Sequence, residues 1–143
     1  MSNLSEYNFF LVHPLSCIRY VDKIMPQLTE SIAASTGERD PASVFDNVLT
    51  GEWLLVVGEE DGEYAGFGML EAREGVKTKQ LNLPFGFSPG TLKGVREFFE
   101  FVEDFARQEG FDTVNISSCR EGYDKFAQRL GYEPTMVEYT KEV

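Results

Sequence analysis

The sequence has 143 residues, a formal net charge of −11, 42% hydrophobic residues and 13% aromatic residues. This composition excludes an acidic disordered segment and predicts one folded domain over residues 1–143. The negative charge argues against broad binding to nucleic acid or anionic membranes, and no apolar run reaches the roughly 20 residues that span a bilayer. Two distant cysteines, Cys17 and Cys119, and an N-terminus without the features of a signal peptide predict a reducing, cytoplasmic location.

The N-terminal third is expected to form a strand and two helices. The apolar run Tyr7–Val12 is typical of a short strand. Apolar residues then recur every three or four positions, which predicts a helical face with a kink or break near Met25 because Pro26 lies inside it. Pro41 marks the start of a second helix that ends at Gly51. The first helical face is formed by Leu15, Ile18, Val21, Met25, Leu28 and Ile32.

The middle of the chain predicts three strands in succession. Trp53–Val57 is a compact apolar run, and Asp61-Gly62 favours the positive φ angles of a tight hairpin turn. Tyr64–Glu71 is the return strand, in which glycines alternate with large apolar residues and so indicate a close approach or a bulge on one face. A further strand over about Lys77–Phe85 completes the meander.

The strongest helical pattern follows this meander. A wide apolar stripe runs from Leu92 to Ala106, with Ser88-Pro89 or Thr91 as the N-cap and Gly110 as the stop. From Gly75 to Arg96 there is no Asp or Glu, and the stretch carries four positive charges, so the rest of the chain carries −15 (−11 minus +4). We expect an anion site where this acid-free window reaches the start of the helix, although a solvated edge strand would also carry lysines.

Three more elements are expected near the C-terminus. Phe111–Ile116 is typical of a strand, Tyr123 to Leu130 predicts a helical face that ends at Gly131, and Thr135–Lys141 alternates as a final strand. The unit from Gln80 to Ile116 should form a right-handed parallel crossover, so the sheet is mixed.

This order resembles the GNAT superfamily of acyl-CoA-dependent N-acetyltransferases. The segments that carry the resemblance are WLLVVGEEDGEYAGFGMLEA, which is similar to the central hairpin of the family, and FDTVNISSCREGYDKFAQRLGYEPTMVEYTK, which is similar to its C-terminal pattern. The resemblance covers about Tyr7 to Lys141. It implies an α/β (α+β) fold with the order β-α-α-β-β-β-α-β-α-β and a mixed central sheet in which the parallel fourth and fifth strands splay apart.

The resemblance also implies a site for acetyl-CoA. In the family, the pantetheine arm enters the gap between the fourth and fifth strands, and the pyrophosphate lies at the N-terminus of the helix between them. A helix N-terminus binds phosphate because its first N–H groups are unpaired and its dipole end is positive. The cofactor-binding residues implied here are Leu81, Asn82, Leu83, Gly90, Thr91, Leu92, Lys93, Gly94 and Asn115.

The catalytic chemistry implied by the resemblance is direct attack of an amine on the thioester. A backbone N–H of the fourth strand, at Leu81 or Leu83, would stabilise the oxyanion, and a base or a water chain would take the amine proton. Glu71, at the end of the third strand, is the favoured candidate base ahead of His13 and Glu138. Many relatives place a proton-donating Tyr where this chain has Ala127, so Tyr123, one turn earlier, is the candidate donor to the leaving thiolate. No metal-ligand spacing is present in the sequence.

Two functions from different classes follow. We favour an enzyme that acetylates an amine of a small cationic molecule or a protein, because the surrounding negative charge would attract cations. The alternative is a catalytically degenerate GNAT-like binding or structural module, such as a phage-encoded or virion-associated protein. It is motivated by Phe87 and Leu92, which replace the Arg or Gln and the second small residue of the family phosphate loop. A weaker third interpretation is a nucleic-acid mimic. The twelve Phe are compatible with a homodimer.

Overall fold

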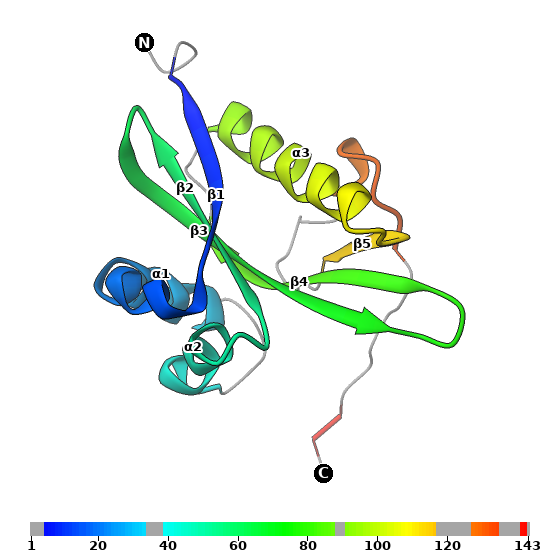
Figure 1. Ribbon diagram of the computed structural model, residues 1–143, viewed down its shortest axis with the longest axis horizontal. Helices are drawn as coiled ribbons and strands as arrows, with labels where there is room; N and C mark the ends of the chain where they lie inside the picture. The colour runs from blue at the N-terminus through cyan, green and yellow to red at the C-terminus, as the bar shows by residue number, and fades with distance from the viewer. Residues whose placement is uncertain (1–4, 34–38, 88–90, 117–126, 135–140, 143) are drawn as a thin grey trace.

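The centre of the molecule is a five-stranded mixed sheet with the order β1-β2-β3-β4-β5 (Figure 1). The computed structural model describes residues 5–33, 39–87, 91–116, 127–134 and 141–142. The mixed sheet with a parallel β4–β5 pair confirms the predicted fold class. Its antiparallel strands are β1 (Tyr7–Val12), β2 (Leu54–Glu60), β3 (Glu63–Glu74) and β4 (Lys79–Phe87), and β5 (Thr113–Ile116) runs parallel to β4.

Helices cover both faces of the sheet (Figure 1). A 3₁₀ helix (Pro14–Tyr20) leads into α1 (Val21–Ala33), and α1 and α2 (Pro41–Leu49) lie on one face, whereas α3 (Leu92–Gln108) lies on the other. Alternating strand residues supply the two cores, because successive side chains point to opposite faces. In β2, for example, Leu55 and Val57 pack with α1 and α2, and Val56 packs with α3.

The hairpin between β2 and β3 forms where the sequence predicts it. Asp61 and Gly62 have φ angles of 52° and 86°, the combination that a two-residue turn of this kind requires. The Asp61 carboxylate also accepts the N–H of Glu6 at 2.9 Å, and the Asp61 N–H donates to the Glu6 carbonyl at 2.8 Å. The turn therefore holds the start of β1 as well as joining two strands.

The first helical face differs from the prediction. Leu15 and Ile18 are 84% and 56% exposed, because the chain from Pro14 to Tyr20 is a 3₁₀ helix, whose three-residue turn brings other positions to the core. The break expected near Met25 is absent, since α1 runs through Pro26 and the helix type changes earlier, between Tyr20 and Val21. The buried positions of α1 are Ile24, Leu28 and Ile32.

The ends of two predicted strands also differ, and β3 is one of them, because it runs on to Glu74 rather than ending at Glu71. β4 begins at Lys79 rather than Lys77, because the chain first makes a turn closed by the Gly75 N–H and the Thr78 carbonyl at 2.8 Å. The predicted strand Thr135–Lys141 falls almost entirely outside the described residues. Of the predicted helix before it, residues 127–129 are described and are helical.

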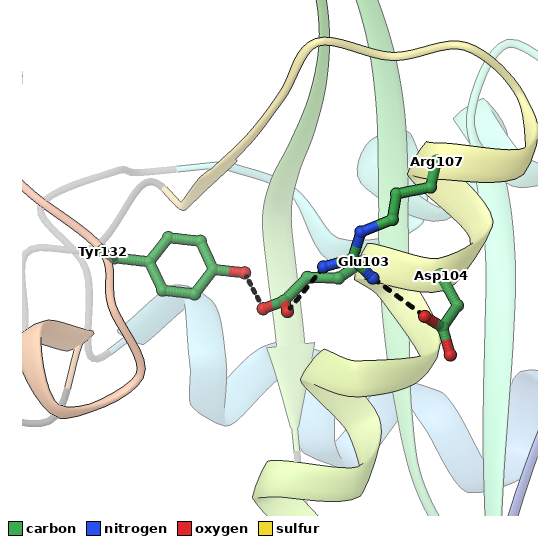
Figure 2. Close-up of polar contacts among 4 residues, drawn as sticks. All are labelled: Glu103, Asp104, Arg107 and Tyr132. Carbon is green, nitrogen blue, oxygen red and sulfur yellow. Dashed lines mark hydrogen bonds and ion pairs between the residues drawn. The ribbon is translucent and has the colours of Figure 1, made fainter.

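The segment around Tyr132 is anchored to α3. The Tyr132 hydroxyl donates to Glu103 Oε2 at 2.8 Å, and the Tyr132 ring lies edge-on to Phe99 with the centroids 5.7 Å apart. Figure 2 shows Arg107 beside this contact, where it is 3.9 Å from Glu103 and 2.9 Å from Asp104. These contacts hold the segment around Tyr132 against α3 and the core beneath it.

Candidate active site

The parallel β4–β5 pair is fastened at the end where both strands begin. Lys79 donates its N–H to Asp112 Oδ2 at 2.8 Å, and the Asp112 N–H donates to the Lys79 carbonyl at 2.7 Å. The paired residues then run from Gln80 opposite Thr113 to Leu83 opposite Ile116. β4 continues beyond this paired stretch to Phe87. The two strands are therefore held together at one end, and β4 extends past the last described residue of β5.

A bulge interrupts β4 where the pairing with β5 ends. Met69 is opposite Phe85 and Glu71 is opposite Asn82, so two steps along β3 match three steps along β4. The extra residue lies at Leu83-Pro84, and a proline is tolerated there because a bulge leaves one backbone position out of the ladder. Pro84 has no N–H to donate, so Leu83 is the candidate oxyanion donor nearest the bulge.

A row of polar side chains crosses three strands on the face covered by α1 and α2. Glu71 of β3 is opposite Asn82 of β4, and Asn82 is opposite Asn115 of β5. Residues in register share a face of the sheet, and Met69, two positions before Glu71, packs in the core on the α1 and α2 side. The structure thus brings together three predicted site residues, one expected to be catalytic and two expected to bind the cofactor.

The contacts of Glu71 explain how this row is held. Asn82 Nδ2 donates to Glu71 Oε1 at 3.2 Å, and Arg73 Nε donates to the same oxygen at 2.9 Å. Among the described residues, no donor contacts Glu71 Oε2. The Glu71 side chain is 27% exposed, whereas Asn82 is 1% exposed. An accessible carboxylate oxygen therefore stands beside a buried amide.

Aromatic side chains adjoin this polar row further along β4. Phe85 lies opposite Met69 and packs against the same core, and its ring is 6.4 Å from that of Trp53. The Arg39 guanidinium lies 5.9 Å from the centre of the Phe85 ring, a cation–π distance. The Phe85 ring is therefore already paired with a cation of the protein itself.

The start of α3 is tied to β1 by a chain of hydrogen bonds. Of the two predicted N-caps, the observed one is Thr91, and its Oγ1 accepts the Gly94 N–H at 3.2 Å. The Thr91 and Tyr7 hydroxyls are bonded to each other, and the Tyr7 hydroxyl donates to Glu60 Oε2 at 3.1 Å. The bond with Thr91 lowers the pKa of Tyr7, but burial and the carboxylates of Glu60 and Glu97 outweigh it and raise that pKa.

The predicted anion site at α3 is therefore only partly available. The Thr91 hydroxyl is committed within the protein, and Lys93 Nζ donates to the Ser5 carbonyl at 2.7 Å. Leu92 is 55% exposed, and the N–H groups of Leu92 and Lys93 precede the first carbonyl-bonded position of the helix. The first turn of α3 contains no acidic residue. Its backbone fits an anion better than its side chains do.

The acid-free window does not form a single cationic patch. Lys79 is at the start of β4, where its Nζ donates to the Glu109 carbonyl at 3.2 Å and lies 4.4 Å from the centre of the Phe111 ring. Lys93 is beyond the other end of β4, about 26 Å of extended strand away. The positive charges of the window are close in sequence but apart in the fold, so only its second half lies near the start of α3.

The other predicted site residues have structural or undescribed positions. The side chains of Leu81 and Leu83 are buried in the core beneath α3, so only their backbones could meet a ligand. The Asn115 amide oxygen accepts the Thr113 hydroxyl at 2.9 Å. Gly90 and Tyr123 lie outside the described residues.

Three neighbours of the site were not predicted from the sequence. Arg73 follows Glu71 at the two-residue spacing that puts both on one face, and this spacing could have indicated the ion pair. Tyr7 reaches Thr91 across 84 residues, and Phe85 meets Trp53 through strand pairing. Neither of these contacts has a local signal. Within the described ranges, no cluster of three His, Cys, Asp or Glu could hold a metal ion, and no helix is long and apolar enough to cross a membrane.

Several solved structures share this architecture over almost their whole length. A ribosomal-protein-alanine N-acetyltransferase from Brucella melitensis biovar Abortus 2308 is 13% identical, has a TM-score of 0.69, and matches 96% of this chain and 99% of its own. AAC(6')-Iy, in complex with the bisubstrate analogue CoA-S-monomethyl-acetylneamine, is 15% identical with a TM-score of 0.68 and covers 96% and 99%. An aminoglycoside acetyltransferase from an uncultured soil metagenomic sample, in complex with sisomicin, is 10% identical with a TM-score of 0.65 and covers 99% and 98%.

The sequence matches no protein-family model and no curated protein. The relationship therefore shows in the arrangement of the elements rather than in the residues. The five-stranded mixed sheet, its parallel β4–β5 pair and the helices on its two faces define the fold of the GNAT acetyltransferases.

Proposed function

We propose that this chain is an N-acetyltransferase that moves the acetyl group of acetyl-CoA directly to an amine of a cationic acceptor. The observation that carries the proposal is Glu71, whose carboxylate has one oxygen held and the other uncontacted by any described donor, on a strand adjoining the parallel pair of a GNAT fold. The net charge of −11 supports a cationic acceptor.

The proposed chemistry assigns a separate task to each part of the site. Glu71 Oε2 accepts a proton from the acceptor ammonium, and the resulting amine attacks the thioester carbonyl. The Leu83 N–H stabilises the oxyanion, the new C–N bond forms and the C–S bond breaks. Tyr123, outside the described residues, is the proposed donor of a proton to the departing thiolate. The nitrogen loses its second proton as the amide forms, this proton restores the Tyr123 phenol through water, and the proton on Glu71 is released to solvent, so the products are the amide, the CoA thiol and one proton.

Acetyl-CoA is proposed to bind the start of α3 through the main chain. We propose that the pyrophosphate accepts hydrogen bonds from the N–H groups of Leu92 and Lys93, which a helix leaves unpaired. The Lys93 ammonium adds charge to this site even while it donates to Ser5, because an ammonium has three donors.

Titration calorimetry with acetyl-CoA tests this placement. Lys93→Gln should weaken binding about tenfold, since one charged donor to phosphate is lost, and Lys77→Gln, an equal loss of charge near the opposite end of β4, should leave binding unchanged. No binding to the unmodified chain at millimolar acetyl-CoA would refute the proposed function. Binding without turnover over a panel of amines would instead support the degenerate binding module.

A further inference from the structure

We propose that Asn82 is a positioning residue that fixes the carboxylate of Glu71, so that Oε2 is the oxygen that meets the acceptor amine. This inference rests on the proposed function and assigns Asn82 a task other than binding the cofactor. The two residues are directly opposite each other across β3 and β4, with Asn82 Nδ2 3.2 Å from Glu71 Oε1.

The chemistry of the two groups fixes the direction of this contact. An ionised carboxylate only accepts hydrogen bonds, so the atom of Asn82 that faces it must be the amide nitrogen. Arg73 Nε donates to the same oxygen at 2.9 Å. Because both donors hold Oε1, rotation of the carboxylate is restricted and Oε2 stays available.

Burial makes Asn82 the firmer of the two anchors. Asn82 is 1% exposed in the middle of β4, whereas the Arg73 side chain is 54% exposed. A solvated ion pair is screened and its long side chain samples many conformers, whereas a buried short side chain has few alternatives. Asn82 therefore sets the position of Glu71, and Arg73 supports it.

Asn82 lies beside the bulge of β4, and this explains why the position of the Glu71 carboxylate matters. Asn82 directly precedes Leu83-Pro84, where β4 loses its regular pairing with β3. The proposed oxyanion donor and the residue that holds the proposed base are thus consecutive in one strand. A small displacement of Glu71 relative to this strand would misalign the base with the reacting carbonyl, and displacements of about 1 Å can cost about 100-fold in rate.

Steady-state kinetics of four variants test the inference. Asn82→Leu keeps the volume but removes the donor, and it should lower kcat about 10- to 100-fold with little change in the KM for acetyl-CoA. Asn47→Leu, the same change at a half-buried position of α2 where the Asn47 amide donates to the Val44 carbonyl, should stay within about threefold. Glu71→Gln should abolish most turnover, and the double variant Glu71→Gln/Asn82→Leu should be no slower than Glu71→Gln alone.

This non-additivity separates a positioning role from a structural one. If Asn82→Leu slows the Glu71→Gln enzyme as much as it slows the unmodified enzyme, or leaves kcat unchanged, the inference is wrong. Absence of turnover in the unmodified chain would refute the proposed function instead.

A second measurement does not depend on activity. The side-chain amide resonances of Asn82, assigned by their loss in Asn82→Leu, should shift and exchange faster with water in Glu71→Ala, because the acceptor is gone. Unchanged resonances in Glu71→Ala would overturn the inference even if Asn82→Leu does not fold.

Discussion

Single glycines on the sheet leave room for the rings of neighbouring elements. A Cβ on Gly68 of β3 would lie 2.5 Å from Phe98 Cζ, and one on Gly58 of β2 would lie 2.7 Å from Phe9 Cε1. Phe9 and Phe98 are themselves in edge contact, with centroids 5.7 Å apart. The alternation of glycine and large apolar residues in Tyr64–Glu71 predicted a close approach on one face. The structure explains it, because Phe98 of α3 packs directly over Gly68 of β3.

Gly68→Ala should lower the free energy of unfolding by about 1–3 kcal/mol, because the buried Phe98 ring must move against its neighbours. Chemical denaturation measures this loss. Gly75→Ala is the control, since a Cβ there meets Thr78 O at 3.4 Å in an exposed turn. In a Phe98→Leu background the same Gly68 change should cost less, and an equal cost in both backgrounds would contradict the explanation.

Tyr64 should make stability depend on pH in the alkaline range. Burial raises the pKa of its phenol above the ordinary 10.0, and its hydroxyl donates to Gln27 Oε1 at 2.6 Å. The folded state therefore favours the neutral phenol, so this contribution is complete below pH 10 and is lost as the pH rises above that value. Tyr64→Phe should lose less stability than the unmodified chain between about pH 9 and 12, although it starts about 1 kcal/mol lower at pH 7. Parallel pH curves for the two chains would contradict this.

At the scale of elements, the start of α3 joins the helix to the edge of the sheet. The bonded chain Gly94–Thr91–Tyr7–Glu60 connects the positive end of the helix dipole to a carboxylate, and each hydrogen bond polarises the next. The Gly94 N–H of the first turn is therefore bonded within the protein and stabilises the fold, whereas the N–H groups of Leu92 and Lys93 are left for a ligand.

Thr91→Val should therefore destabilise the fold by about 1–2 kcal/mol, because it removes the cap and the link to Tyr7 together. Thermal unfolding checks the effect. Thr29→Val is the matched control, since the exposed Thr29 hydroxyl only donates to the Met25 carbonyl within α1, and it should change stability by less than about 0.5 kcal/mol. Equal losses in the two variants would show that Thr91 is not a specific link.

Elements with local signals were predictable, and features set by pairing were not. Asp61-Gly62 fixes its turn by its own backbone preferences, and Pro41 after the capping Asp40 marks the start of α2 in the same local way. The bulge at Leu83-Pro84 depends on how β4 aligns with β3, and the sequence of β4 alone does not contain that register. The same limit applies to the site. Glu71 was predicted from its place at a strand end, but its bond to Asn82 requires the strand pairing.

At the scale of the whole molecule, the fold separates two kinds of surface. The acid-free window contributes only its second half to the start of α3, while the polar row with Glu71 lies on the opposite face of the sheet, beside α1 and α2. An acyl donor bound near the start of α3 and along β4 and an acceptor bound beside Glu71 would meet at the bulge of β4. The sheet itself would then bring the two substrates together.

Amine-dependent release of CoA thiol from acetyl-CoA tests the central claim most directly, with a cationic polyamine as the acceptor and a reaction without amine as the blank. The unmodified chain should release thiol in proportion to the acetylated amine formed, and Glu71→Gln, which keeps the size of the side chain, should lose most of this release while binding acetyl-CoA as before. Equal release by the two chains, or release that does not depend on amine, would contradict an acetyl transfer in which Glu71 accepts the proton.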